Sequence, residues 1–353
     1  MKQQKIIFAY DINQALTETV AGISYDKLYI LADRHTAEKC LPLIGSFTDA
    51  HPYTLITIEA GDGAKTLDTL SDVWMRLSSG GATRRSLLIN LGGGMVTDLG
   101  GFAAASFKRG IPFINVPTSL LGAVDAAVGG KTGINFNGLK NEIGAFAPAV
   151  AVLISTRFFD SLDDENLLSG YAEMLKHGLL DSPETFGRLL DYDVRSRNNH
   201  HLLSLLEESV NIKRRVVEED PFEKGLRKAL NLGHTVGHAF ESYCFSINRP
   251  LLHGYAVAWG VVCELILSHR QCGFPIESLK RTAEFVYRNY GALPITCKEY
   301  EALYEFMTHD KKNEMDKINF TLLSEPGNIC LDQTATKENI FIMFDIYRDL
   351  FRL

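Results

Sequence analysis

The spacing of hydrophobic residues divides the chain into two regions of different character. Up to about residue 160, short apolar runs alternate with stretches whose apolar positions recur every three or four residues. Lys27–Leu31, Tyr53–Ile58 and Ser86–Leu91 have the pattern of buried strands, whereas Thr66–Leu77 has helical spacing. Because parallel strands are joined by helical crossovers, this alternation predicts a parallel sheet covered by helices.

Beyond about residue 160, long helical patterns dominate and glycines become rarer. Segments such as 227–247 and 253–272 have helical spacing, and Ile318–Leu323 is the main strand-like run. We therefore predict two domains, an α/β domain over residues 1–160 and a helical domain over residues 161–353.

Composition and charge exclude several classes of protein. The 353 residues carry a formal net charge of −7, and the basic run Lys213–Arg215 is followed at once by acidic residues, so no nucleic-acid partner is expected. No apolar stretch reaches the roughly 18 residues of a transmembrane helix, so no membrane association is expected. The six cysteines form no CxxC pair, which is typical of reduced cysteines in the cytoplasm.

Two glycine-rich segments of the first region are candidate phosphate-binding sites. Gly92–Gly94 follows a predicted strand, and a helix is expected to begin near Asp98, so backbone N–H groups would face a pyrophosphate. The spacing is not GxGxxG, and a simple tight turn is the alternative. Gly129–Lys131, followed by Lys140 and Asn141, offers close backbone approach and fixed cations to a phosphate, with a solvated loop as the alternative.

Three segments of the second region carry side chains that bind metals. Glu173 and Lys176 stand three residues apart on a predicted helix in apolar surroundings, where a carboxylate must be paired or bind a metal. His234 and His238 share a helical face, as a zinc pair would, but the glutamate of the metalloprotease HExxH motif is missing. With His253, Glu173 and His234 would form a three-ligand site with open positions, which is typical of catalytic metals. A plain ion pair and satisfied core histidines are the alternatives.

In their order and spacing, these segments resemble the 3-dehydroquinate synthase family. The pattern comprises GGGxxxD, PTSLLxxxDAAVGGKTGIN, KN, AExxK, ExGxR, NxGHTxGHAxE and HG, and the resemblance covers about residues 25–325. It implies a Rossmann-like N-terminal domain, an all-α C-terminal domain and a site in the cleft between them. It also implies a cytoplasmic NAD- and metal-dependent lyase of the shikimate pathway of aromatic amino acid biosynthesis.

The reaction implied by the resemblance converts a seven-carbon sugar phosphate acid, 3-deoxy-D-arabino-heptulosonate 7-phosphate, to 3-dehydroquinate and phosphate. NAD transiently oxidises one hydroxyl, phosphate is eliminated, the ketone is reduced again, and an intramolecular aldol step closes the ring. The metal, zinc with cobalt as the alternative, would polarise the hydroxyl that loses hydride.

The resemblance further implies roles for individual residues. The metal ligands would be Glu173, His234 and His253. His238 would steer proton transfer with Glu223 as its orienting partner, and Lys131 and Lys176 are further catalytic candidates. NAD would be held by Asp33, Gly92, Gly93, Gly94, Asp98, Thr118, Ser119, Lys131, Lys140, Asn141, Ser161 and Leu162. The substrate would be held by Asp125, Lys131, Asn141, Lys176, Lys213, Arg227, Asn231, His238 and Lys312, with Lys311 as the alternative to Lys312. Arg109 would reach the site of the partner subunit, which implies a homodimer.

The chain departs from the family pattern at the adenosine end of the cofactor. Gly61–Gly63 reads Gly-Asp-Gly where the family often has Gly-Glu-Lys, although Lys65 is close by. His35 replaces a common asparagine, and Thr97 replaces a frequent glycine. These changes leave the individual NAD contacts open.

Three alternatives compete with the synthase interpretation. Another sugar phosphate cyclase would act on a substrate without the carboxylate, and the presence of Lys213, Arg227 and Asn231 counts against it. A metal-dependent NAD alcohol dehydrogenase would not need the AExxK and VGGKTGIN segments. A degenerate binding or regulatory protein would be expected to have lost a ligand or a phosphate-site lysine.

Overall fold

The computed structural model describes residues 4–137, 139–308 and 318–353. The predicted substrate residue Lys312 and its alternative Lys311 therefore lie outside the described residues.

The chain forms two compact units. The first comprises Met1–Asp163 with Arg197–Val210, and the second comprises Asp164–Ser196 with Asn211–Leu353. The predicted domain limits stay a prediction, because compactness alone does not show which residues fold independently.

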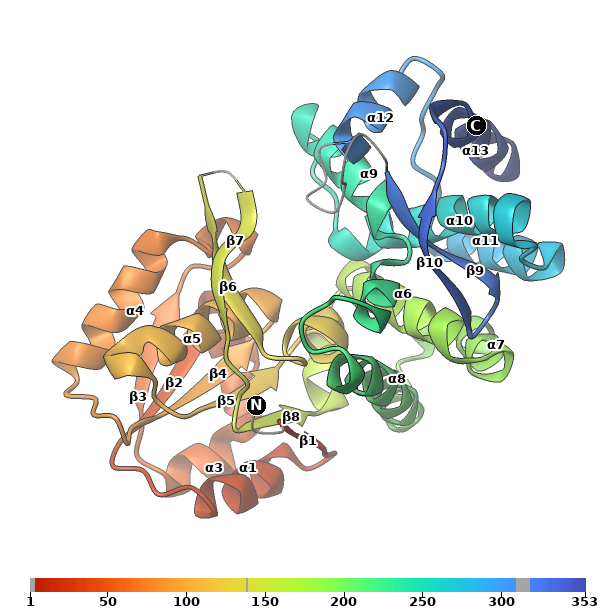
Figure 1. The fold of residues 1–353 in the computed structure, drawn as a ribbon. Coiled ribbons are helices and arrows are strands. Elements are labelled where there is room, and N and C mark those ends of the chain that lie inside the picture. Colours follow the sequence, from red (N-terminus) through yellow and green to blue (C-terminus); the bar gives the residue numbers. More distant parts are fainter. Residues whose placement is uncertain (1–3, 138, 309–317) are drawn as a thin grey trace. The chain divides into compact units, whose positions relative to one another are not determined.

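A six-stranded sheet lies at the centre of the first unit (Figure 1). In sheet order its strands are β1 (Lys5–Phe8), β8 (Ala151–Ile154), β5 (Phe113–Pro117), β4 (Leu87–Gly92), β2 (Leu28–Asp33) and β3 (Thr54–Ile58). All neighbouring pairs are parallel, and β2, β4, β5 and β8 are buried along their whole length. Strands buried on both faces have nearly continuous apolar sequences, which is why the sequence predicted them. The predicted parallel α/β fold is confirmed.

Helices of the first unit cover this sheet, with α5 in contact with β4 and β5, and α1 with β8. α5 begins at Gly94 rather than near Asp98, because the backbone is already helical at the last residue of the glycine turn. The helices are α1 (Ile12–Ala21), α2 (Arg34–Lys39), α3 (Gly45–Ala50), α4 (Leu67–Ser79) and α5 (Gly94–Ser106), and α8 (Asn199–Glu219) is shared with the second unit. Short 3-10 or π turns span Leu41–Ile44, Asp62–Ala64, Phe107–Arg109, Gly122–Ala126 and Thr156–Ser161.

An antiparallel hairpin of β6 (Lys131–Phe136) and β7 (Leu139–Phe146) follows Gly129 and Gly130 and contains Lys131, Lys140 and Asn141, for which a solvated loop was the alternative. Thr132 and Ile134 of β6 are buried, and β6 packs against α5. This packing supplies burial that local glycine-rich sequence does not indicate.

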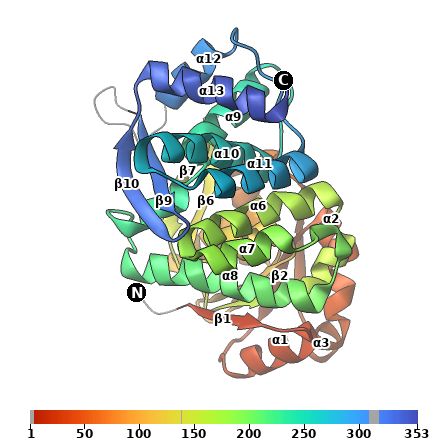
Figure 2. The ribbon, with the colours of Figure 1, turned by 90° about the vertical axis from the view of Figure 1, so that its right-hand side faces the viewer.

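Helices dominate the second unit, as predicted (Figure 2). α6 and α10 are buried over most of their length, which is typical of helices at the centre of a core. The elements are α6 (Asp164–Asp181), α7 (Pro183–Asp191), α9 (His234–Ser246), α10 (His253–Cys272), α11 (Ile276–Tyr290), α12 (Tyr300–Thr308), β9 (Asn319–Glu325), β10 (Asn328–Thr334) and α13 (Lys337–Phe351), with 3-10 turns at Val194–Ser196 and Leu226–Asn231.

Two details of the second unit bear on the sequence predictions. The strand-like run Ile318–Leu323 is confirmed, since β9 pairs with β10. The predicted helix over 227–247 is wrong at its start: a 3-10 turn ends at Asn231, and Gly233 adopts a left-handed backbone (φ +79°) before α9 begins. Periodicity could not reveal this break, because the apolar spacing continues across it.

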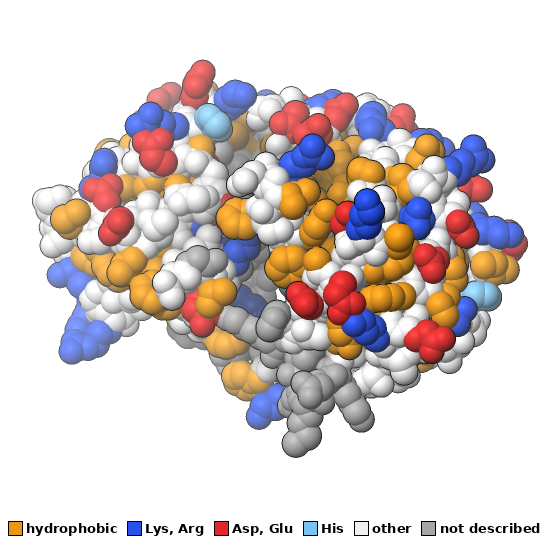
Figure 3. Space-filling model, turned by 90° about the horizontal axis from the view of Figure 1, so that it is seen from above, with side chains coloured by type: hydrophobic (Ala, Val, Ile, Leu, Met, Phe, Trp, Pro, Cys, Tyr) orange, Lys and Arg blue, Asp and Glu red, His pale blue; other side chains and the backbone are white. Residues whose placement is uncertain are grey.

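The surface charges and the state of the cysteines match what the composition led us to expect. Acidic and basic side chains are interspersed on the face drawn in Figure 3. Among the described residues, none belongs to a helix that is long and apolar enough to cross a membrane. All six cysteines are free thiols.

Candidate active site

The side chain of Glu173 is fully buried in the middle of α6. Its carboxylate forms an ion pair with Lys176, one turn later on the same helix, yet neither carboxylate oxygen makes a hydrogen bond within the described chain. A buried carboxylate is costly unless it is paired or coordinates a metal. Its surroundings therefore decide what Glu173 does.

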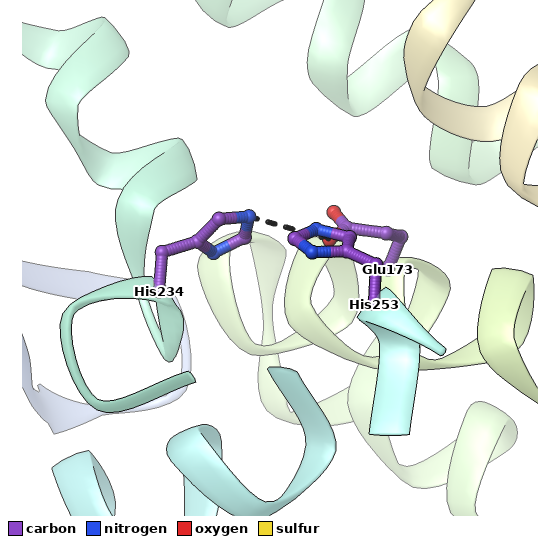
Figure 4. A group of neighbouring side chains, drawn as sticks. All are labelled: Glu173, His234 and His253. Carbon is purple, nitrogen blue, oxygen red and sulfur yellow. Dashed lines mark ion pairs between the residues drawn. The ribbon is translucent and has the colours of Figure 1, made fainter. Parts of the chain in front are cut away.

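Two histidines from other helices point at this carboxylate (Figure 4). Nε2 of His234, the first residue of α9, lies 3.5 Å from Glu173 Oε1, and Nε2 of His253, the first residue of α10, lies 3.7 Å from the same oxygen. Two ligands that each bind one tetrahedral ion at about 2.1 Å lie about 3.4 Å apart. The three groups thus have the spacing of a metal centre, and the predicted trio is brought together.

The other ring nitrogen of each histidine faces a hydrogen-bond acceptor. Nδ1 of His234 lies 3.1 Å from the carbonyl oxygen of Leu232, and Nδ1 of His253 lies 3.0 Å from Glu241 Oε2. Neither acceptor can donate, so each Nδ1 carries hydrogen and a neutral ring keeps the Nε2 lone pair for a metal. Glu241 is part of the motif NxGHTxGHAxE, but no role was predicted for it.

Close packing of α6 and α10 brings Glu173 and His253 together. The N–H of Gly254 donates to Ser169 Oγ (3.1 Å), and a Cβ at Gly254 would lie 1.8 Å from the carbonyl oxygen of Ser169. Only glycine permits this approach, one turn before Glu173 on α6. Gly254 therefore allows α10 to pack closely enough against α6 for His253 to reach Glu173.

Charged neighbours shift two pKa values in the polypeptide alone. Burial by itself raises the pKa of Glu173, but Lys176 and His253 outweigh burial and hold that pKa well below its usual value. Burial lowers the pKa of His253, but Glu173 and Glu241 outweigh burial and raise it to about 10. A divalent cation among these atoms would replace the proton of His253, because metal ligands must be deprotonated.

His238 lies beside this trio, one turn after His234 on α9. Its ring centroid is 5.3 Å from that of His234 and 6.0 Å from that of His253. Ligand atoms of His238, Glu241 and His253 also lie within 4.8 Å of one another. The first group fits a metal better, because it contains a buried carboxylate whose oxygens make no hydrogen bond within the described chain.

Three predicted anion-binding residues of the second unit, Lys213, Arg227 and Asn231, lie on α8 and on the turn before α9, whereas Lys176 lies on α6. Lys213 and Arg227 are nearly buried, and Arg227 donates to the carbonyl oxygen of Pro221 (2.9 Å). Asn231 donates to Glu223 Oε1 (3.1 Å). The predicted roles of these residues, including Glu223 as a partner of His238, stay predictions.

In the first unit, the predicted cofactor residues lie at the carboxyl ends of adjacent strands. The strand order reverses between β2 and β4, and ligands of such sheets bind at this point, outside the carboxyl ends. Asp33 ends β2, Gly92 ends β4, and Thr118 follows β5 with its N–H donating to the Gly92 carbonyl (3.0 Å). The Asp33 carboxylate also caps α2 through Thr36 N (2.9 Å).

Lys65, which was not among the predicted site residues, lies at the same sheet edge. Its side chain is nearly buried, and its ammonium group pairs with Asp98 Oδ2 (2.5 Å) and with Asn141 Oδ1. Asp98 and Asn141 were both predicted to hold the cofactor. Lys65 therefore places a buried cation next to two of the predicted cofactor residues.

The other predicted residues of the first unit are spread over several segments, and Arg109 lies before the amino end of β5, away from the carboxyl ends of the strands. The backbone N–H of Gly122 donates to Ser119 Oγ (3.1 Å), and Ser161 Oγ donates to the carbonyl oxygen of Phe158 (3.0 Å). The remaining residues sit on the hairpin, in short turns or just after one: Lys131, Lys140, Asp125, Leu162 and Arg109. Their predicted contacts with ligands or a partner stay predictions.

Comparison with known proteins decides the family. Models of the 3-dehydroquinate synthase N-terminal and C-terminal domains match residues 55–169 and 170–313. The 3-dehydroquinate synthase of Parabacteroides distasonis is 52% identical over 351 residues, which cover 99% of each chain. This chain belongs to the 3-dehydroquinate synthase family.

Solved structures of sugar phosphate cyclases share the fold of this family member. The 2-epi-5-epi-valiolone synthase of Streptomyces hygroscopicus, with NAD⁺ and Zn²⁺ bound, is 23% identical with a TM-score of 0.87, covering 99% of this chain and 98% of its own. A 2-deoxy-scyllo-inosose synthase complexed with carbaglucose-6-phosphate, NAD⁺ and Co²⁺ is 22% identical with a TM-score of 0.82, covering 98% and 96%. The predicted family, enzyme class and fold are confirmed.

Proposed function

We propose that this enzyme of the 3-dehydroquinate synthase family converts 3-deoxy-D-arabino-heptulosonate 7-phosphate to 3-dehydroquinate and phosphate. The observation that carries the proposal is the 52% identity to a 3-dehydroquinate synthase along almost the whole of both chains. The cofactors are NAD and a divalent metal, zinc or cobalt. Both kinds of group are bound in the structures of fold relatives.

Glu173, His234 and His253 would hold the metal, because they combine a buried carboxylate with two imidazole nitrogens at ligand spacing. When bound, NAD would supply a hydride acceptor and the metal a positive charge that polarises the substrate hydroxyl. His238 is the side chain that moves a proton at this hydroxyl, since its ring lies beside both histidine ligands.

A group of cations and polar side chains binds the anionic ends of the substrate. Lys213 and Arg227 are nearly buried, and a charge in such a place attracts an anion more strongly than an exposed one. Lys176 lies beside Glu173 and completes the set in the second unit. The proposed binding residues are Lys176, Lys213, Arg227, Asn231 and His238, together with Asp125, Lys131, Asn141 and Lys312.

The carboxyl ends of β2, β4 and β5 would hold the cofactor, through the glycine turn and through Asp98 with its partner Lys65. The N-terminus of α5 faces this edge, and its N–H groups suit a pyrophosphate. The proposed contacts are Asp33, Gly92, Gly93, Gly94, Asp98, Thr118, Ser119, Lys131, Lys140, Asn141, Ser161 and Leu162.

The enzyme is proposed to be a cytoplasmic homodimer with domain limits near residues 160 and 161. Six free cysteines support a reducing compartment. The dimer follows from the family resemblance, which implies that Arg109 reaches the partner's site, and Arg109 is exposed in this chain.

The deciding experiment measures phosphate release from 3-deoxy-D-arabino-heptulosonate 7-phosphate with catalytic NAD and zinc, before and after chelation. We expect metal-dependent release without net NADH. No release from a protein that binds both NAD and zinc would contradict the proposal. The substrates of valiolone-forming and inosose-forming cyclases would then be tested, and NADH accumulation would indicate a dehydrogenase.

A further inference from the structure

Glu264 is a fully buried carboxylate that has no part in the proposed chemistry. It lies on α10, three turns after His253. Its Oε2 accepts a hydrogen bond from the N–H of Gly233 (2.6 Å), and its Oε1 accepts one from the N–H of Val236 (3.2 Å). Both N–H groups belong to the start of α9, where a helix has no acceptors of its own.

Glu264 therefore caps α9 from a neighbouring helix. The residue in the N-cap position is Gly233, which has no side chain with which to cap. It must be glycine, because its φ is +79° and a Cβ would lie 2.5 Å from Val261 Cγ2 of α10. A carboxylate at this end of a helix is stabilised by the aligned peptide dipoles, which offsets the cost of burying it.

The capped turn also orients a metal ligand. His234 follows Gly233 directly, and its Nδ1 donates to the carbonyl oxygen of Leu232, the residue before Gly233. A shift of the Gly233 peptide would rotate this carbonyl and move the imidazole with it. We infer that Glu264 is a positioning residue of the metal centre, which α10 thereby fixes twice, through His253 directly and through Glu264 acting on His234.

The inference rests on the proposed function, and metal affinity tests it. Glu264→Gln keeps the size and one acceptor oxygen, whereas Glu264→Ala removes both acceptors. We expect the zinc dissociation constant, measured by competition with a chelator, to rise about tenfold for Glu264→Gln and about 100-fold for Glu264→Ala. The visible spectrum of the cobalt-substituted protein is expected to change in both, because the orientation of His234 changes.

Ser268→Ala is the matched control. Ser268 is also fully buried on α10, and its Oγ accepts a hydrogen bond from the N–H of Leu323 on β9 (3.0 Å). The substitution leaves a buried N–H without an acceptor, as at Glu264, but away from the histidines. We expect a lower melting temperature with a zinc dissociation constant within about twofold of wild type.

Different outcomes overturn different claims. Wild-type affinity and an unchanged cobalt spectrum for Glu264→Gln would overturn the inference and leave the proposed function standing. A wild-type protein that binds no zinc, or a His234→Ala variant that binds it normally, would overturn both. If neither Glu264 variant folds, hydrogen exchange of wild type decides: zinc should slow exchange at the amides of Gly233 and Val236, and unchanged rates at both would overturn the inference.

Discussion

The proposed metal centre of the second unit and the proposed cofactor edge of the first unit are built in opposite ways. The metal centre consists of side chains, since Glu173, His234 and His253 converge from three helices and further groups hold both rings. The cofactor edge consists largely of backbone at the ends of strands, supplemented by the side chains of Lys65 and Asp98. A single side-chain substitution should therefore reduce zinc binding strongly at the metal centre but reduce NAD binding only modestly at the cofactor edge.

Removal of one metal ligand is expected to have the largest effect. Glu173→Ala, His234→Ala and His253→Ala should each abolish zinc retention and lower kcat by about a thousandfold, since a metal stabilises charge in the transition state by several kcal/mol. Metal content after gel filtration and phosphate release measure both effects. His269→Ala is the control, because His269 is an exposed histidine on the same helix as His253. Full activity in any of the three ligand variants would remove that residue from the set.

The pH dependence of zinc affinity is expected to be the next largest effect. His253 has a pKa raised to about 10 in the polypeptide alone, so zinc displaces a proton from it at neutral pH. Affinity should therefore rise about tenfold per pH unit, or about 100-fold from pH 6 to pH 8. Chelator competition at several pH values measures the slope.

The raised pKa of His253 makes the stability of the zinc-free protein fall with rising pH, although zinc affinity rises. A raised histidine pKa contributes stability that is fully present below the unfolded value of about 6.5 and is lost as the pH rises towards 10. The melting temperature of the zinc-free protein should fall over this pH range. The increase in melting temperature on adding zinc should become larger over the same range. A zinc affinity independent of pH would show that His253 is not protonated before zinc binds.

Glu241→Gln should weaken zinc binding about tenfold, because Glu241 accepts the Nδ1–H of His253 and strengthens this nitrogen ligand. The amide of Glu241→Gln still has an oxygen that accepts the Nδ1–H of His253, whereas Glu241→Ala has none. Glu241→Ala should therefore bind zinc more weakly than Glu241→Gln. Zinc dissociation constants of both variants measure the effect. An unchanged zinc dissociation constant in Glu241→Ala would show that the hydrogen bond from His253 to Glu241 does not contribute to zinc binding.

Lys65→Met is expected to raise the NAD dissociation constant about tenfold at most and to leave zinc affinity unchanged, because Lys65 acts on the cofactor edge through Asp98. Lys27→Met is the matched control. Lys27 is an exposed lysine of the same unit whose ammonium group donates to the carbonyl oxygen of Gly80 (2.7 Å), and its loss should change NAD affinity by no more than about twofold. Equal effects of the two substitutions would mean that the buried pair of Lys65 and Asp98 has no specific part in binding NAD.

The sequence was sufficient to predict those parts of the site whose chemistry is limited by residue type. A carboxylate and histidines in apolar helical segments have few explanations, and their order identified the family before any distance was known. The parallel sheet followed from apolar strands alternating with helical spacing. Lys65 was not recognised because its importance comes from burial against Asp98 and Asn141, which are far from it in the chain.

By itself, the sequence determined the family, the parallel sheet and the helical second unit, and it predicted the trio Glu173, His234 and His253. These depend on periodicity and on rare residue types, which are local properties. Only the tertiary structure decided the β6–β7 hairpin, the break at Gly233 and the hydrogen bonds of Glu241 and Glu264. Each of these depends on contacts between segments distant in sequence, and the burial and hydrogen bonds that fix them exist only once the helices and strands have packed.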